Sequence, residues 1–249
     1  MRKICMFCGE VGREILNSHV IPAGVYRRID AVPIKVDSSS MIAKYDTAQL
    51  RGRYFFRSCE DRFKITEDCF YRYVDRPSAE LLIAENSGEA IFINCPLDDQ
   101  VVLAKFFLGV LWRCELAQVE GVRLNRYSKI IKSFLKDEVS LLDIQSEGIF
   151  VIIRYLNVDL RDYLALPIRR KITDGLNAYI LPMVGFESLI VLDRRASMSA
   201  VWKYRVGGEI GQISVATAET SFFYGFPNLK LSDLEMKGKL EKNQINGKL

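Results

Sequence analysis

The sequence opens with two cysteines separated by two residues, Cys5 and Cys8, and Gly9 follows them directly. Two thiolates at this spacing can both reach one tetrahedral Zn²⁺, with about 2.3 Å between the metal and each sulfur. The glycine can adopt the positive φ that such a knuckle needs. A structural zinc site normally requires a second ligand pair, and the segment around Cys59 offers only one further cysteine. Taken alone, the pattern therefore indicates metal chemistry without completing a four-ligand site.

Composition and charge place the chain among ordinary globular proteins, since 49% of its 249 residues are hydrophobic and 27% are charged. The formal net charge of +4 permits contact with phosphates without requiring it. Met1 is followed almost at once by the cysteine pair, with no apolar run of signal-peptide length. The most apolar stretch, residues 101–112, contains Lys105 and is shorter than the roughly 20 residues of a membrane span. We therefore expect a cytoplasmic protein without membrane contact.

Apolar periodicity and turn residues predict an α+β fold. Pro22 and Gly24 indicate a turn with a helical turn possible after it, and residues 36–50 are expected to form a loop. Asp98 and Asp99 could cap the longest helix, which is apolar nearly all round and therefore belongs in a core or in an oligomer interface. The expected helices cover residues 59–73, 98–118 and 127–136. The expected strands cover residues 53–56, 90–94, 148–156, 179–183, 187–192 and 201–206.

The polar segment Asp75 to Ser78 is the expected domain boundary. Residues 1–76 would form an N-terminal module, and residues 77–228 an α+β domain with a buried helix and antiparallel strands. Residues 229–249 would be a charged tail, because this segment contains five lysines and no aromatic residue.

Three blocks of the sequence resemble a group of HNH-endonuclease-like bacterial proteins, whose N-terminal module has a treble-clef (ββα, His-Me finger) fold. Residues 5–28 contain the Cys-x-x-Cys-Gly knuckle, a Ser-His-x-Ile-Pro motif and an aliphatic-Tyr-Arg segment. Residues 55–70 match the next block in register, and residues 103–113 match a helix ending in Leu-Trp-Arg. The resemblance covers about the first 135 residues. It implies a treble-clef module joined to the α+β domain, in a family often associated with antiphage defence or mobile elements. The matching positions of the second block are Cys59, Glu60, Phe63, Glu67 and Phe70.

His19 is the only histidine of the chain, and it falls on the histidine of the family motif. In active relatives this imidazole activates water, and a divalent ion, Mg²⁺ or Mn²⁺, polarises the phosphate. The usual ligands of that ion are an Asp before the histidine and an Asn or His at the start of the helix. Here Ser18 and Glu60 hold these positions, and Glu60 could supply one ligand. A structural role and a zinc-ligand role remain alternatives for His19.

The third zinc cysteine of the family falls on Phe56. Cys5, Cys8 and Cys59 remain, so a four-coordinate zinc would need Cys69, a carboxylate or water as its fourth ligand. The alternative is a metal-free treble clef that is held together by packing, with Phe56 in the place of the ligand.

Basic residues surround the module and are interleaved with aromatic residues. Guanidinium groups suit bidentate phosphate contacts, so nucleic acid is the expected partner and DNA is favoured. The alternative is a solvated face in which these side chains pair with Asp30, Glu60 and Asp61. The candidate nucleic-acid-binding residues are Arg27, Arg28, Arg53, Arg57 and Arg62.

Two functions from different classes follow from this sequence. The first is an HNH-like metal-dependent nuclease, or a degenerate relative of one, that acts on nucleic acid with antiphage defence as its context. In that case His19 and Glu60 would be catalytic. The second is a non-catalytic subunit that uses the treble clef as a scaffold to bind nucleic acid or protein. A protein partner would then contact the C-terminal domain.

Overall fold

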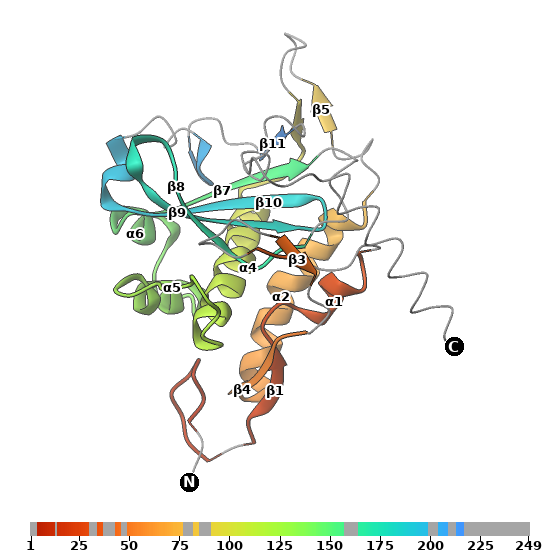
Figure 1. Cartoon of the computed structure of the whole chain (residues 1–249), viewed down its shortest axis with the longest axis vertical. Coiled ribbons are helices and arrows are strands. Elements are labelled where there is room, and N and C mark those ends of the chain that lie inside the picture. Colours follow the sequence, from red (N-terminus) through yellow and green to blue (C-terminus); the bar gives the residue numbers. More distant parts are fainter. Residues whose placement is uncertain are drawn as a thin grey trace.

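A seven-stranded sheet with helices packed against it forms the larger part of the computed structural model (Figure 1). The structure describes residues 4–12, 14–29, 34–36, 43–45, 49–76, 82–84, 91–156, 164–198, 204–208 and 213–216. Two short two-stranded sheets complete the strands of these ranges. The predicted α+β class is confirmed.

The N-terminal part consists of an antiparallel strand pair that leads into a long helix. Strand β1 (Leu16–His19) pairs with β4 (Arg51–Phe55), and α2 (Arg57–Val74) begins two residues after β4. The turn predicted at Pro22 and Gly24 is instead the start of the short helix α1 (Ala23–Tyr26), in which Pro22 is the N-cap and Gly24 is helical. The predicted strand near residue 53 and the predicted helix from residue 59 are both confirmed.

The large sheet is antiparallel except where β11 (Ile213–Ala216) runs parallel to β7 (Ile149–Leu156). Strands β9 (Asn177–Met183) and β10 (Phe186–Leu192) form the predicted hairpin around Val184 and Gly185. The order across the sheet is β5 (Leu82–Ala84), β6 (Ile91–Ile93), β11 (Ile213–Ala216), β7 (Ile149–Leu156), β10 (Phe186–Leu192), β9 (Asn177–Met183) and β8 (Ile168–Lys171).

Helix α4 (Leu97–Leu116) is the centre of the fold. It contacts α2 on one side and α5 (Tyr127–Leu135) on the other, and it also reaches β7 (Figure 1). Helix α6 (Leu141–Ser146) lies beside α5 and leads into β7. Because α4 is surrounded on several sides, it is buried nearly all round, which confirms the core position predicted from its composition.

Four sequence predictions need correction. Residues 36–50 are not simply a loop, since β2 (Ile34–Val36) pairs with β3 (Ala43–Tyr45). Asp98 and Asp99 do not cap α4, because Pro96 holds the N-cap position and both carboxylates lie in the first turn, where they complement the helix dipole. His19 lies at the end of a strand that was not predicted. The strand predicted for residues 201–206 is wrong for its described part, since Tyr204 to Val206 lead into a turn.

Two short 3-10 segments lie in connections of the large sheet, η2 (Thr173–Gly175) between β8 and β9 and η3 (Arg194–Met198) after β10. The predicted tail, residues 229–249, lies outside the described residues. None of the helices in the described ranges has both the length and the apolar composition that a membrane span requires.

Gly148 joins α6 to β7 in a conformation that excludes other residues. Its φ is +86°, and an added Cβ would lie 2.7 Å from the backbone nitrogen of Arg194. We expect Gly148→Ala to lower the free energy of unfolding by more than the about 1–3 kcal/mol that the left-handed conformation alone costs, because a backbone clash is added to the strain. Urea unfolding measures this difference.

Gly175→Ala is the matched control. Its φ is +67°, but a Cβ there would meet no atom within 4 Å in the described part of the chain. It should therefore show the strain without the clash. Equal losses in the two variants would contradict the packing of η3 against Gly148.

Candidate functional site

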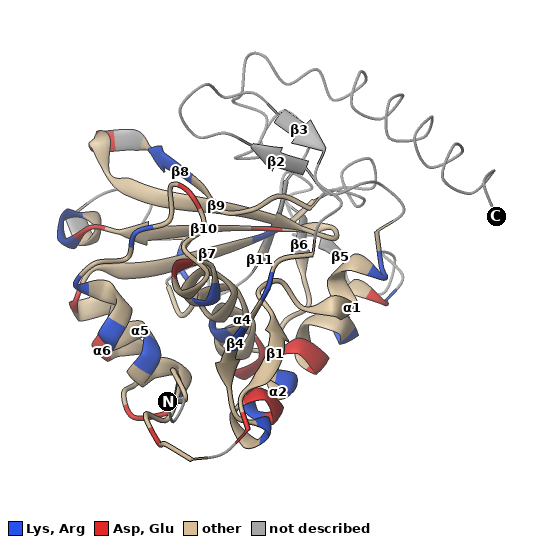
Figure 2. Cartoon of the chain, turned by 60° about the horizontal axis from the view of Figure 1, so that its bottom comes forward, with Lys and Arg blue, Asp and Glu red and all other residues tan. Residues whose placement is uncertain are grey.

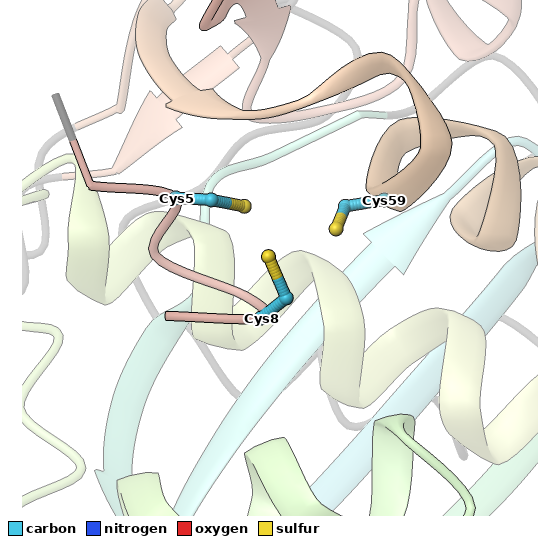
Figure 3. A group of neighbouring side chains, drawn as sticks. All are labelled: Cys5, Cys8 and Cys59. Carbon is cyan, nitrogen blue, oxygen red and sulfur yellow. The ribbon is translucent and has the colours of Figure 1, made fainter. Parts of the chain in front are cut away.

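Three cysteines from two separate segments converge at the N-terminal end of the structure (Figure 3). Cys5 and Cys8 flank a tight turn, and Cys59 lies in the first turn of α2. Their Sγ atoms all lie within 4.8 Å of one another. A tetrahedral zinc with bonds of about 2.3 Å holds its sulfurs about 3.8 Å apart, so a small inward movement would complete this geometry. The predicted convergence is confirmed, and the cluster could bind zinc.

The environment of the cluster lowers the pKa of Cys5. Burial alone would raise its pKa, but the backbone amides of Cys8, Phe56 and Phe7 hydrogen-bond to the sulfur, and the pKa is lowered overall. Burial raises the pKa of Cys59 to about 12, and the neighbouring Cys5 and Cys8 add to this rise. A cation would be needed to hold all three sulfurs deprotonated, which is how thiol sites couple metal binding to proton release.

The fourth position of the cluster has no cysteine. Phe56 is the N-cap of α2 and only 1% of its surface is exposed, so its ring belongs to the hydrophobic core. Cys69 is not the missing ligand, because it lies ten residues further along α2, about 15 Å from Cys59. Its Sγ donates instead to Asp99 Oδ1 at 3.8 Å. Cys8 is half-buried, so water can approach the cluster from its side.

Ser18 and Glu60 meet between β1 and the first turn of α2. Side chains alternate across a strand, so Ser18 faces the helix while Asn17 and His19 lie on the other face. Ser18 is 3% exposed, and its hydroxyl donates to Glu60 Oε2 at 2.7 Å. Glu60 directly follows Cys59, so the segment that contributes a sulfur to the cluster also fixes this carboxylate.

His19 is held by Gln49 and lies opposite Arg51 in the β1–β4 strand pair. Gln49 Oε1 lies 3.1 Å from Arg51 Nη2 and 3.0 Å from His19 Nε2. Since a guanidinium can only donate, this atom is the amide oxygen, and the imidazole donates to it from Nε2. A neutral ring then keeps its lone pair on Nδ1. The imidazole is not among the groups that gather around the three sulfurs in the described ranges.

The pKa of His19 is lowered, chiefly because the ring is partly removed from water. Arg51 and Arg113 lower it further through their positive charges, while the hydrogen bond to Gln49 and the charge of Glu60 act in the opposite direction. The neutral imidazole is therefore the favoured form at neutral pH.

Arg113 is a buried cation beneath the β1–β4 strand pair, with 1% of its surface exposed. Its Nη1 donates to the carbonyl oxygen of His19 at 3.3 Å and lies 3.4 Å from Glu67 Oε1. Burial raises the pKa of Glu67, and the charge of Arg113 offsets part of that rise. The pair thus connects α4 and α2 to the backbone of the histidine. Both residues lie in the matched sequence blocks, but a role was predicted for neither.

Tyr71 of α2 has a buried hydroxyl and packs against α1. Its hydroxyl is buried without a hydrogen-bond partner in the described part of the chain, and burial raises its pKa to about 12. The guanidinium carbon of Arg28 lies 4.0 Å from the centre of the Tyr71 ring. A Cβ on Gly24 would lie 2.4 Å from the Tyr71 hydroxyl, so only glycine allows α1 to approach this closely.

Two of the predicted basic residues are engaged by carboxylates. Arg28 makes a double hydrogen bond to Asp75, at 2.6 Å from both Nε and Nη2, and Arg62 pairs with Asp137 at 3.3 Å. The acidic partners differ from those that the sequence suggested. Acidic and basic side chains mix along α2 (Figure 2). The other three predicted residues, Arg27, Arg53 and Arg57, are exposed.

Comparisons with models of known families, with curated proteins and with solved structures found no match to this chain.

We expect the purified full chain to bind about one zinc ion at the three-cysteine cluster, with the fourth position filled by a weaker donor. Cys59→Ser should abolish stoichiometric zinc in elemental analysis. Cys69→Ala, on the same helix but outside the cluster, should leave it unchanged. Zinc retained by Cys59→Ser and lost from Cys69→Ala would place the metal elsewhere.

The single histidine gives one unambiguous imidazole titration by NMR. We expect a pKa below the ordinary 6.5, higher in Arg51→Gln and lower still in Gln49→Ala, because these residues act in opposite directions. Since the folded pKa lies below the unfolded one, the unfolded chain binds this proton more tightly. The free energy of unfolding should therefore fall as the pH drops below 6.5.

Arg53→Gln, two residues away on the same strand, is the matched control and should leave the titration unchanged. A wild-type value above 6.5 would contradict the geometry described for Gln49 and Arg51.

Proposed function

We propose that residues 1–76 form an HNH-like ββα module and that the protein hydrolyses phosphodiester bonds of nucleic acid. The observation that carries this proposal is the contact of 2.7 Å between Ser18 and Glu60. It places Ser18 of β1 against Glu60 in the first turn of α2, beside Cys59, while the neighbouring His19 lies on the other face of the strand. The strand pair β1–β4, the helix α2, the three thiols and the histidine support the proposal, since a ββα module of this kind would contain all of them.

His19 would act as the general base through Nδ1. Gln49 holds the opposite ring nitrogen, so the ring is oriented and its tautomer is set. A lowered pKa keeps the base neutral and able to accept a proton from water. Arg113 fixes the His19 backbone from below through the carbonyl contact of 3.3 Å. Arg113 would therefore be a positioning residue.

Glu60 would hold a divalent ion. Mg²⁺ is commonly bound by one or two carboxylates together with waters and substrate phosphate, so a single carboxylate beside a hydroxyl is compatible with it. When bound, Mg²⁺ or Mn²⁺ would polarise the phosphate and stabilise the leaving oxygen. Ser18 is a neutral ligand in a position where a carboxylate would bind more strongly.

The exposed arginines of the β1–β4 strand pair support a nucleic-acid substrate. Arg51 and Arg53 are exposed and lie opposite His19 and Asn17 in the strand register. Guanidinium groups on the same face as the base could hold the phosphates on either side of the scissile bond. DNA and antiphage defence are proposed on the resemblance alone.

A non-catalytic scaffold is the second candidate, and the Ser18–Glu60 contact also favours it. The hydroxyl hydrogen-bonds directly to the carboxylate where an ion would lie, and Ser18 itself stands where the family has the carboxylate of an Asp. Arg28 and Arg62 are already engaged by Asp75 and Asp137. A protein of this kind would bind nucleic acid or a partner without cleaving it.

Plasmid nicking with Mg²⁺ or Mn²⁺ separates the two candidates. We expect His19→Ala to reduce cleavage by at least about 100-fold, the lower range for the loss of a general base, and Glu60→Gln to reduce it comparably. Asp61→Asn, an exposed neighbour on α2, should retain wild-type activity. Ser18→Asp should increase cleavage at limiting metal, because it supplies a second carboxylate.

Equal background nicking by wild type and His19→Ala would reject the nuclease. Salt-sensitive DNA binding would then support the scaffold, and the absence of such binding would remove nucleic acid as the partner.

A further inference from the structure

A hollow of about 270 Å³ opens beside the first turn of α5, away from the candidate nuclease site. Its wall is formed by α5, by Val139 after that helix, by Glu147 at the end of α6 and by Arg194 at the start of η3. Helix α4 lies between α5 and α2, so this hollow and the β1–β4 strand pair with His19 are on different sides of the helical layer (Figure 1).

The charge of the wall is predominantly positive. Arg126, Lys129 and Arg194 line the hollow, and Glu147 is the one carboxylate among its lining residues. Glu147 Oε2 lies 2.5 Å from Arg194 Nη2, so this ion pair fixes one guanidinium in the wall. Arg126 and Lys129 are exposed at its mouth. An anion that enters would therefore meet two further cations.

Tyr127 gives the hollow a flat, oriented surface. The guanidinium carbon of Arg126 lies 4.7 Å from the ring centre of Tyr127, and Arg126 Nη2 donates to the Tyr127 hydroxyl at 2.7 Å. Ile130 and Val139 add apolar surface on the same wall. A mixture of apolar side chains and a few convergent polar groups is characteristic of small-molecule sites.

The start of α5 already has a carboxylate beside it. This nine-residue helix has no acidic residue in its first turn, and its N-cap, Arg126, makes no side-chain capping bond. The Ser128 hydroxyl in that turn donates to Glu115 Oε2 of α4, and Glu115 Oε1 accepts from the backbone N–H of Leu124. The attraction of the hollow for an anion therefore comes from the side chains of its wall and not from the helix dipole.

We propose that this hollow binds a small organic phosphate, with the phosphate between Arg126 and Lys129 and the organic part against Tyr127 and Ile130. The volume of about 270 Å³ lies just below the roughly 300–1,000 Å³ of sites for drug-sized ligands, so it suits a compact ligand. An extended polyanion fits less well. The acidic residues Asp137 and Glu138 adjoin Val139, so the basic wall does not continue as a track along the surface.

Calorimetry at low ionic strength tests the proposal on the full-length His19→Ala protein, so that the result does not depend on the nuclease. Phenyl phosphate is the probe, and inorganic phosphate and phenol are run in parallel. We expect saturable binding of phenyl phosphate that is tighter than either parallel compound. Arg126→Gln and Lys129→Gln should each weaken it about tenfold, as expected for the loss of one charge-assisted contact.

Two matched controls lie next to the site without lining it. Lys132→Gln is on the same helix, and Arg195→Gln removes a guanidinium that is bound to Asp193 at 2.8 Å. Both should keep wild-type affinity. If these controls weaken phenyl phosphate binding equally, the loss of affinity would follow from net charge alone, and the proposed site would be overturned.

Three other results would also overturn the proposal. They are no saturable binding of phenyl phosphate, inorganic phosphate bound as tightly as phenyl phosphate, and a single-stranded oligonucleotide bound through Lys129 in preference to it. The last result would identify a nucleic-acid surface instead.

Discussion

The packing of α2 against α4 is the interaction on which the rest of the structure depends. Phe70 of α2 and Phe106 of α4 stack at 4.1 Å between ring centres, and Phe55 of the preceding strand β4 stacks on Trp112 of α4 at 5.8 Å. Phe70 also contacts Phe186 of the large sheet at 5.6 Å. One continuous hydrophobic cluster therefore runs from the cysteine knuckle through both helices to the sheet. The candidate site lies on the surface of this core and takes its rigidity from it.

The polar groups near the site are held by the same packing. Arg113 belongs to α4, yet it binds the backbone of His19 and pairs with Glu67 of α2. A buried cation is costly unless it is paired and hydrogen-bonded, so these partners are fixed in place. Removing Glu67 alone would leave the cation uncompensated. The histidine is thus supported from the α+β part of the chain, far away in sequence.

Local patterns predicted the elements well wherever periodicity was strong. The buried strand β7, the hairpin of β9 and β10, and the helices α2, α4 and α5 follow from apolar spacing and turn residues. Short elements escaped, because three or four residues such as β2 or β1 carry too little periodic signal. The partner of β1 is the distant β4, which a local pattern does not contain, whereas β2 pairs with the next strand, β3.

The sequence by itself determined which side chains could bind a metal or accept a proton. The Cys-x-x-Cys-Gly knuckle, the single histidine and Glu60 were all identifiable from residue type and spacing. Only the tertiary structure decided which of them meet. It brought Cys59 to the knuckle and left Cys69 beside Asp99, and it placed Ser18 rather than His19 against Glu60. The physical reason is that side-chain chemistry is a property of each residue, whereas convergence requires the packing of segments far apart in the chain.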